Sequence, residues 1–198
     1  MFRLFFKDYG MKKFTFFISI ICFVFLVAFN TNAGESDVDV DANNEQANKA
    51  YNNGIDHMHK AKQILIVGDS AFAYNYRATS DAKAKKEYEK AIDDFKKTLD
   101  ADPSMKEAYN NLGFCYRKIG KLDESLKAYK RALKLDPDFE QALEYLGETY
   151  LPLDDLKRAN LNLLKLTNLK SPYADTLNHA IEIYKLSQIN KKLQKDKK

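Results

Sequence analysis

The sequence is poor in cysteine, proline, glycine and tryptophan. Its 198 residues include two cysteines, four prolines, seven glycines and no tryptophan. So few cysteines exclude a disulfide-stapled domain, and so few glycines and prolines exclude collagen-like and low-complexity chains. A hydrophobic content of 45% with 30% charged residues and few turn formers favours an all-helical domain.

Positive charge is not in large excess either. The formal net charge is +4, of which +3 falls within residues 1–33, so that the remaining chain carries only +1. Proteins that bind nucleic acid are normally far more basic. We therefore expect no nucleic-acid partner.

The N-terminal 33 residues have the order of a secretory signal peptide. Lys12 and Lys13 precede sixteen uncharged residues, 14–29, and small residues then lead to Ala33 and a cut before Gly34. An uncharged run of this length falls short of the roughly 20 residues that cross a bilayer comfortably. We expect cleavage and export, to a bacterial periplasm or an equivalent space. The alternative is an uncleaved signal anchor that tethers the chain through residues 14–29.

Two short assignments follow from export. Cleavage leaves Cys115 as the remaining cysteine, which excludes an intramolecular disulfide, and we interpret it as a small core residue. Residues 34–46 are acidic and lack aromatic side chains, so we predict a flexible linker there.

From residue 47 onward the sequence repeats itself with a period of 34 residues, which is typical of a helical solenoid. A shift of 34 superimposes these pairs: Asp102–Pro103 on Asp136–Pro137, Leu112–Gly113 on Leu146–Gly147, and Tyr116 on Tyr150 and then Tyr184. Spacings of three and four within one period predict two helices separated at Gly120. Each Asp-Pro pair predicts a helix start, with an aspartate cap and a first-turn proline.

Glycine recurs at one phase inside the predicted first helices, at Gly113 and Gly147. Glycine costs a helix interior about 1 kcal/mol relative to alanine, so a recurring glycine suggests a shared steric reason. We expect close contact between the two helices of each unit. Small residues at Ser125 and Ala132 in the second helix would allow that approach.

Residues 106–139 resemble a tetratricopeptide repeat. The signature phases are occupied by Tyr109, Leu112, Gly113, Tyr116, Ser125, Tyr129, Ala132 and Pro137. Residues 140–173 form a degenerate second copy, in which Pro152 predicts an early end of the first helix and Asp154 or Asp155 a cap for the next. The resemblance implies an all-α fold, an α-α superhelix of stacked helical hairpins.

The flanks match the repeat less well. The whole repeat region is predicted at 47–173, with an irregular first unit that contains an insertion of helix or loop at 64–80. Residues 174–198 predict a C-terminal capping helix and a basic tail, because each unit of a solenoid buries its apolar face only against a neighbour. The favoured interpretation of the tail is a solvated helix end, and contact with an anionic lipid or an acidic partner is the alternative.

Reactive chemistry finds little support in the sequence. Ser70 follows Gly68 and Asp69 as in some esterases, but Asp175 and His179 do not reproduce the expected Asp-x-x-His, and no parallel-sheet pattern follows. His57 and His59 are two residues apart and therefore point to different faces of a helix, whereas two metal ligands on one helix need a spacing of three or four. We expect no catalytic site, metal or cofactor.

The resemblance implies a concave groove, lined by the first helices, that binds a peptide or a partner helix. By similarity, the groove residues are Glu107, Asn110, Phe114, Arg117, Lys118, Gln141, Glu144 and Glu148. Family members that bind terminal carboxylates have cations where this chain has Glu107, Gln141 and Tyr145, which disfavours that subclass and a cytosolic chaperone partner.

Three functions follow, in decreasing order of support. The first is a non-enzymatic scaffold or adaptor that binds a protein segment in the groove, in an exported compartment. The second is a structural or assembly component that is tethered to a membrane through residues 14–29 or is homo-oligomeric. The third is a hydrolase that uses Ser70. The sequence identifies neither the partner nor the oligomeric state.

Overall fold

The computed structural model describes residues 36–69 and 74–195, and the side chains of residues 41–65 and 81–195 within them. The chain divides into two units, Met1–Glu45 and Gln46–Lys198. Of the N-terminal unit only residues 36–45, the start of a long helix, are described. The predicted signal peptide or anchor at 1–33 lies outside the described residues, as does Ser70.

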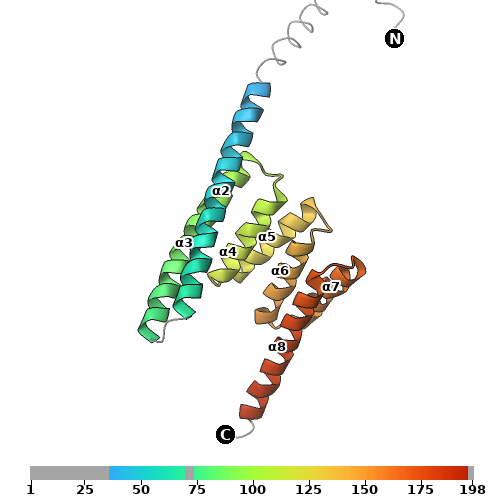
Figure 1. Cartoon of the computed structure of the whole chain (residues 1–198). Coiled ribbons are helices and arrows are strands. Elements are labelled where there is room, and N and C mark those ends of the chain that lie inside the picture. The colour runs from blue at the N-terminus through green and yellow to red at the C-terminus, as the bar shows by residue number, and fades with distance from the viewer. Residues whose placement is uncertain (1–35, 70–73, 196–198) are drawn as a thin grey trace, which may run out of the picture. The chain divides into compact units, whose positions relative to one another are not determined.

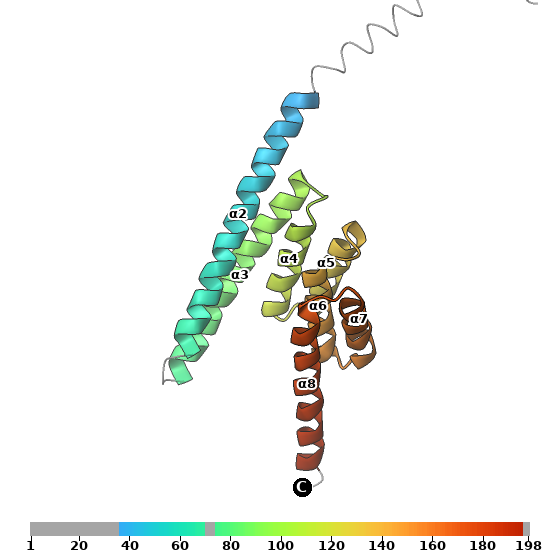
Figure 2. The same ribbon diagram turned by 45° about the vertical axis from the view of Figure 1, so that its right-hand side comes forward.

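The described chain is built from helices, which Figures 1 and 2 show. The helices are α2 (Ser36–Asp69), α3 (Tyr74–Ala101), α4 (Lys106–Lys118), α5 (Leu122–Leu135), α6 (Glu140–Tyr150), the 3-10 turn η1 (Leu151–Leu153), α7 (Leu156–Asn168) and α8 (Tyr173–Lys195). Consecutive helices pair as the hairpins α2–α3, α4–α5 and α6–α7, and α8 packs on both α6 and α7. The predicted all-α fold of stacked hairpins is confirmed.

Two neighbouring apolar clusters form the core of residues 46–198. The first joins α2, α3 and α4 around Tyr88, Phe95 and Leu112. The second joins α5 to α8 around Tyr129, Leu166 and Leu177. Among the described residues, the buried apolar side chains run from Ala47 to Ile181, so this part of the chain contains its own complete hydrophobic core.

Gly113 has the steric role that the repeat predicts, whereas Gly147 faces Leu177 of α8 and not the second helix of its own unit. A Cβ atom on Gly113 would lie 2.8 Å from Cε1 of Tyr129, a ring that is fully buried in α5. A Cβ atom on Gly54 would likewise lie 2.7 Å from Cε1 of Phe95 in α3. The first hairpin is therefore packed in the same way as the second. Ser125 is also buried and donates a hydrogen bond of 2.8 Å to the carbonyl oxygen of Gly113. Close packing within these hairpins therefore depends on small residues on both helices.

The predicted helix starts at the Asp-Pro pairs are wrong. α4 begins at Lys106 and α6 at Glu140, three residues after each proline. The aspartates instead close the preceding turns, because Asp102 Oδ1 accepts a hydrogen bond from the N–H of Ser104 and Asp136 Oδ1 accepts one from the N–H of Asp138. An aspartate can satisfy an N–H two residues ahead in a turn as readily as one at a helix start.

The described parts of the predicted linker, residues 36–46, and of the predicted insertion, residues 64–69 and 74–80, belong to extended helices. α2 begins at Ser36, so the segment interpreted as flexible is helical from that residue onward. Residues 64–69 continue α2 and residues 74–80 continue α3, which makes the first hairpin longer than the others. An acidic, polar composition lowers the apolar contacts of a segment but does not prevent a helix that continues from a packed one.

The irregularity predicted at Pro152 is confirmed. α6 ends at Tyr150, the proline lies in η1, and Asp154 adopts a left-handed conformation with φ of 59°. Asp155 then caps α7, where its side chain accepts a hydrogen bond from the N–H of Arg158. Over the described ranges, the structure contains no helix with the length and apolarity that crossing a bilayer requires.

Candidate protein-binding face

The side chain of Phe114 is the centre of the most unusual cluster in the molecule. Phe114 lies in α4 and is buried, with 7% of its surface exposed. Three cations surround its ring, with distances to the ring centroid of 4.7 Å for Lys62 Nζ, 5.3 Å for Lys118 Nζ and 5.7 Å for Arg117 Cζ. A cation over an aromatic face is stabilised by the ring quadrupole, which helps to hold three like charges together.

Two carboxylates of α6 lie near these cations. Glu148 forms an ion pair of 2.8 Å with Arg117, and both side chains are about four-fifths buried. Glu144 is more deeply buried, at 5% exposed, and burial together with the charge of Glu148 raises the pKa of its carboxyl to about 7. Near neutral pH the three cations therefore face one full negative charge and one partial one. We name Lys62, Phe114, Arg117, Lys118, Glu144, Tyr145 and Glu148 the Phe114 face.

The positive charge of the Phe114 face carries an energetic cost. Burial, and then the nearby charge of Arg117, lowers the pKa of Lys118 below its ordinary value, and Lys62 contributes in the same direction. The Nε atom of Arg117 is buried and has no hydrogen-bond partner among the described residues. A negatively charged group placed between these cations would raise the lowered pKa of Lys118 and accept a hydrogen bond from Nε of Arg117.

A second, neutral cluster lies along the same helices. Asn110 donates a hydrogen bond of 3.1 Å to Gln141, whose amide in turn reaches the hydroxyl of Tyr145 at 3.4 Å. Asn111 donates one of 3.0 Å to the hydroxyl of Tyr51 in α2. The amide oxygen of Asn110 is buried without a partner in the described part of the chain.

The structure brings most of the predicted groove residues together. Phe114, Arg117, Lys118, Glu144 and Glu148 form one cluster, and Asn110 and Gln141 form the other. Glu107 joins neither cluster. It is exposed, and its carboxylate lies 3.9 Å from the ammonium of Lys106.

Sequence reasoning missed Lys62, one of the three cations. Lys62 follows Gly54 by eight residues, whereas α4 ends five residues after the equivalent Gly113. It therefore lies in the part of α2 that extends past the repeat, where a comparison of repeat phases gives no signal. Gly54 gives the repeat position of the first unit, because it packs against the ring of Phe95 as Gly113 packs against the ring of Tyr129.

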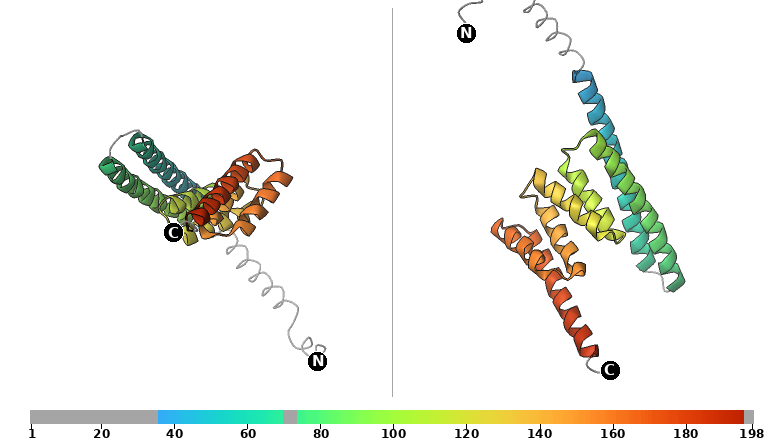
Figure 3. Two further views of the ribbon diagram at one scale, coloured as in Figure 1. Left: turned by 90° about the horizontal axis from the view of Figure 1, so that it is seen from below. Right: turned by 180° about the vertical axis from the view of Figure 1, so that it is seen from behind.

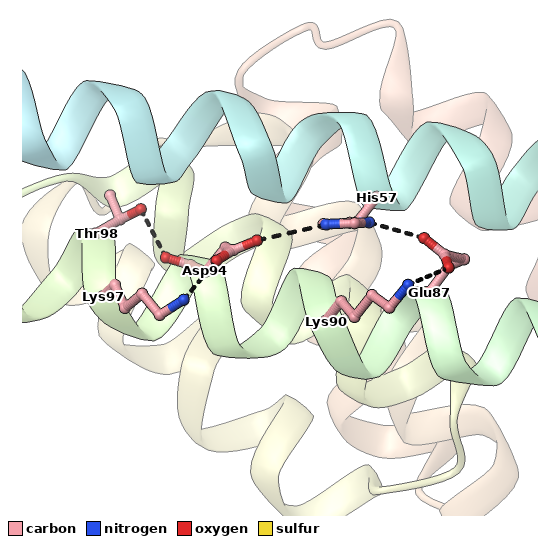
Figure 4. Close-up of polar contacts among 6 residues, drawn as sticks. All are labelled: His57, Glu87, Lys90, Asp94, Lys97 and Thr98. Carbon is pink, nitrogen blue, oxygen red and sulfur yellow. Dashed lines mark hydrogen bonds and ion pairs between the residues drawn. The ribbon is translucent and has the colours of Figure 1, made fainter.

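His57 connects α2 to α3 through two carboxylates. Figure 4 shows His57 of α2 between two carboxylates of α3. Its Nδ1 lies 2.7 Å from Glu87 and its Nε2 lies 3.8 Å from Asp94, and Lys90 and Lys97 pair with the same two carboxylates. His59 and His179 are exposed. The described residues contain no group of three or more potential ligands that could hold a metal ion.

Cys115 occupies the core position that the sequence predicts. It is fully buried in the first cluster, and burial raises the pKa of its thiol to about 12. A thiol in this environment is a poor nucleophile.

Comparison with known proteins supports the resemblance to the tetratricopeptide repeat. The tetratricopeptide repeat family matches residues 107–139, which form α4, α5 and the turns that follow them. A 98-residue region, half of this chain, is 33% identical to the Small glutamine-rich tetratricopeptide repeat-containing protein 2 of Saccharomyces cerevisiae. That region spans 28% of the yeast protein, so most of the yeast protein has no counterpart in the match.

The chain is also similar, at low sequence identity, to chains of solved structures. The Sgt2 TPR domain of Aspergillus fumigatus gives a TM-score of 0.47 at 21% identity and covers 67% of this chain and 82% of its own. The first TPR of Spaghetti (RPAP3), bound to the HSP90 peptide SRMEEVD, gives 0.46 at 20% identity, with coverages of 63% and 92%. MamA from Desulfovibrio magneticus RS-1 gives 0.43 at 22%, with coverages of 63% and 75%.

Proposed function

We propose that this protein is a non-enzymatic interaction scaffold that binds a segment of a partner protein across the Phe114 face, in an exported compartment. The observation that carries the proposal is the Phe114 face itself, which lies on first helices of tetratricopeptide-like hairpins. Adaptors of this kind recognise partners through the side chains of those helices, and the matched repeat supplies three of the seven residues of the face, Phe114, Arg117 and Lys118.

The composition of the face suits protein recognition. Aromatic and arginine side chains dominate the energetics of protein interfaces, and Phe114, Tyr145 and Arg117 stand together here with ring centroids of Phe114 and Tyr145 5.5 Å apart. Arg117 lies over both rings, at 5.7 Å and 5.5 Å. The anchor is therefore assembled before any partner arrives, which lowers the entropic cost of binding.

The charge of the face sets the chemistry of the partner segment. Lys62 and Lys118 add two positive charges beside the Arg117–Glu148 pair, so we expect a segment with acidic side chains. Binding of an acidic group between the two lysines would raise the lowered pKa of Lys118. The signal-like order of residues 12–33 supports an exported location for this interaction.

Capture of partners from the native cell extract by the purified protein tests the proposal. The informative variant carries Lys62→Glu and Lys118→Glu, because both ammonium groups can be changed without removing a buried ring. The matched control carries Lys127→Glu and Lys130→Glu, which makes the same change of charge on exposed positions of α5. Circular dichroism checks that all three proteins are equally helical.

We expect the wild-type protein and the α5 control to capture the same partner, and the Lys62→Glu, Lys118→Glu variant to lose it at least tenfold. Equal capture by all three proteins would place the interaction on another surface. If the folded wild-type protein captures only the proteins that a denatured sample also captures, the proposed scaffold function is wrong.

A further inference from the structure

The C-terminal half of α8 carries an apolar face that the fold does not use. Leu177 and Ile181 are fully buried against α6 and α7. Beyond them the apolar side chains change side, because Ile183 and Leu186 lie about 160° and about 140° around the helix from Ile181 at 100° per residue. Ile183, Leu186, Ile189 and Leu193 are all exposed, by 54% to 60%. These four residues form one stripe, which we name the α8 stripe.

The stripe lies on a part of the helix that the stack does not need. α8 has 23 residues, whereas the first helices α4 and α6 have 13 and 11. The extra length corresponds to roughly 15 Å at 1.5 Å per residue. In Figures 1 and 3 the C-terminal half of α8 projects past the ends of the neighbouring helices. The stripe therefore lies on a segment that extends beyond the helices on which α8 packs.

The charge of this segment has one sign. Residues 183–195 contain Lys185, Lys191, Lys192 and Lys195 and no acidic residue, and Lys185 forms an exposed ion pair of 2.8 Å with Glu182 just before the segment. The lysines lie to the side of the stripe or opposite to it, so the segment is a basic amphipathic helix. Helices of this kind bind in the plane of a membrane surface, with the apolar side chains at the acyl boundary and the cations near anionic headgroups.

We infer that residues 183–195 of α8 dock on an anionic lipid bilayer. A second copy packed stripe to stripe would bring together two segments that both carry net positive charge, which disfavours self-association through the stripe. An acidic protein helix would need a carboxylate opposite each lysine, although Lys191 and Lys195 lie on the far side from the stripe. An anionic surface attracts all four, because its potential extends about one Debye length, roughly 8 Å, beyond the headgroups.

Flotation with lipid vesicles tests this inference on residues 36–198, which contain the complete described core and exclude the apolar N-terminal run. The vesicles consist of phosphatidylcholine alone or of phosphatidylcholine with phosphatidylglycerol. We expect binding to the anionic vesicles that weakens as salt is added, and at least tenfold weaker binding to the neutral ones. Removing three charges with Lys191→Gln, Lys192→Gln and Lys195→Gln should lower the partition coefficient about 100-fold, at about fivefold per lysine.

The apolar half of the inference has its own variant and a matched control. Leu186→Gln with Ile189→Gln should lower the partition coefficient at least tenfold. Leu161→Gln with Leu164→Gln changes two leucines of α7 that are equally exposed, at 58% and 57%, and should change it less than twofold. All of these side chains are exposed, so the variants should keep the thermal midpoint of the wild-type protein.

Three results would overturn the inference. The first is no flotation of the wild-type protein with anionic vesicles at low salt, and the second is flotation that the α8 variants do not reduce. The third is a dimer in sedimentation velocity that Leu186→Gln with Ile189→Gln dissociates, which would make a second copy the occupant. If a soluble polyglutamate peptide binds while the vesicles do not, the stripe belongs to an acidic protein partner instead.

Discussion

Replacing Gly113 by alanine tests the packing principle on which the hairpins depend. The new methyl group would lie within 3.0 Å of three ring atoms of Tyr129, whose side chain is completely buried and cannot turn away. Overpacking of this kind costs about 1–3 kcal/mol, whereas alanine gains about 1 kcal/mol over glycine in helix propensity. Because a buried ring cannot move aside, we place the cost in the upper part of that range, at about 2–3 kcal/mol, and expect the free energy of unfolding to fall by about 1–2 kcal/mol.

The same change at Gly147 is the matched comparison. There the methyl group would come even closer to its neighbour, at 2.5 Å from Cδ2 of Leu177. That neighbour is the end of a flexible side chain, which can rotate by a rotamer, so the steric cost and the gain in propensity should offset each other to within about 1 kcal/mol. The change in the free energy of unfolding therefore depends more on the rigidity of the neighbouring side chain than on its distance from the new methyl group.

Urea unfolding of the wild-type protein and the two variants measures the change in the free energy of unfolding at each glycine. The midpoints can be compared if the free energy depends on urea concentration with the same slope in all three proteins. A double variant, Gly113→Ala with Tyr129→Leu, adds a control. Removing the ring should make the alanine neutral or stabilising, with a coupling of about 0.5–3 kcal/mol between the two positions. If Gly113→Ala alone is as stable as the wild-type protein, close approach of α4 and α5 is not the reason for the recurring glycine.

Three further predictions concern single side chains. Burial raises the pKa of the Glu144 carboxyl to about 7, so the native protein keeps a proton that the unfolded chain releases near pH 4.5. The free energy of unfolding should therefore fall by about 3 kcal/mol as the pH rises through 7. Urea midpoints at pH 5 and pH 8 measure this loss, which should be smaller in Glu144→Gln. Asp155→Ala should cost about 1 kcal/mol because it removes the cap of α7, and Asp155→Asn should keep most of the stability in thermal unfolding. The Cys115 thiol, whose pKa burial raises to about 12, should react with a thiol reagent at the rate of unfolding, and fast labelling of the folded protein would contradict its place in the core.

The sequence predicts the fold well where one side chain meets its partner within a single repeat. The period of 34 residues, Gly113 and Ser125 all report contacts between adjacent helices of one hairpin. The helix starts were wrong because an aspartate before a proline has two possible N–H partners. Local sequence does not decide between a turn and a helix cap, and the choice depends on how the preceding helix enters the turn.

The Phe114 face was only partly predictable for a different reason. Arg117 and Glu148 lie in adjacent repeats, at positions that the family resemblance places in the groove. Lys62 could not, because its position depends on how far α2 extends beyond the repeat and on the packing of α2 beside α4. Likewise the raised pKa of Glu144 follows from burial in the assembled stack, which the sequence of α6 alone does not reveal.

The end of the stack explains why one helix can have two separate roles. In the second hairpin, the ring of Tyr129 packs against Gly113. In the third hairpin, Leu177 of α8 occupies the equivalent place against Gly147. The first half of α8 therefore completes the hairpin α6–α7 and closes the core at Ile181, after which no further helix follows among the described residues. Within residues 183–195, Tyr184 still packs against this core, and its hydroxyl donates a hydrogen bond of 2.6 Å to Asp154, whereas the four residues of the α8 stripe are exposed. Four aliphatic side chains kept on one side, with four lysines and no acid, need a cause outside the stack, and a surface that attracts cations and accepts apolar side chains is a sufficient one.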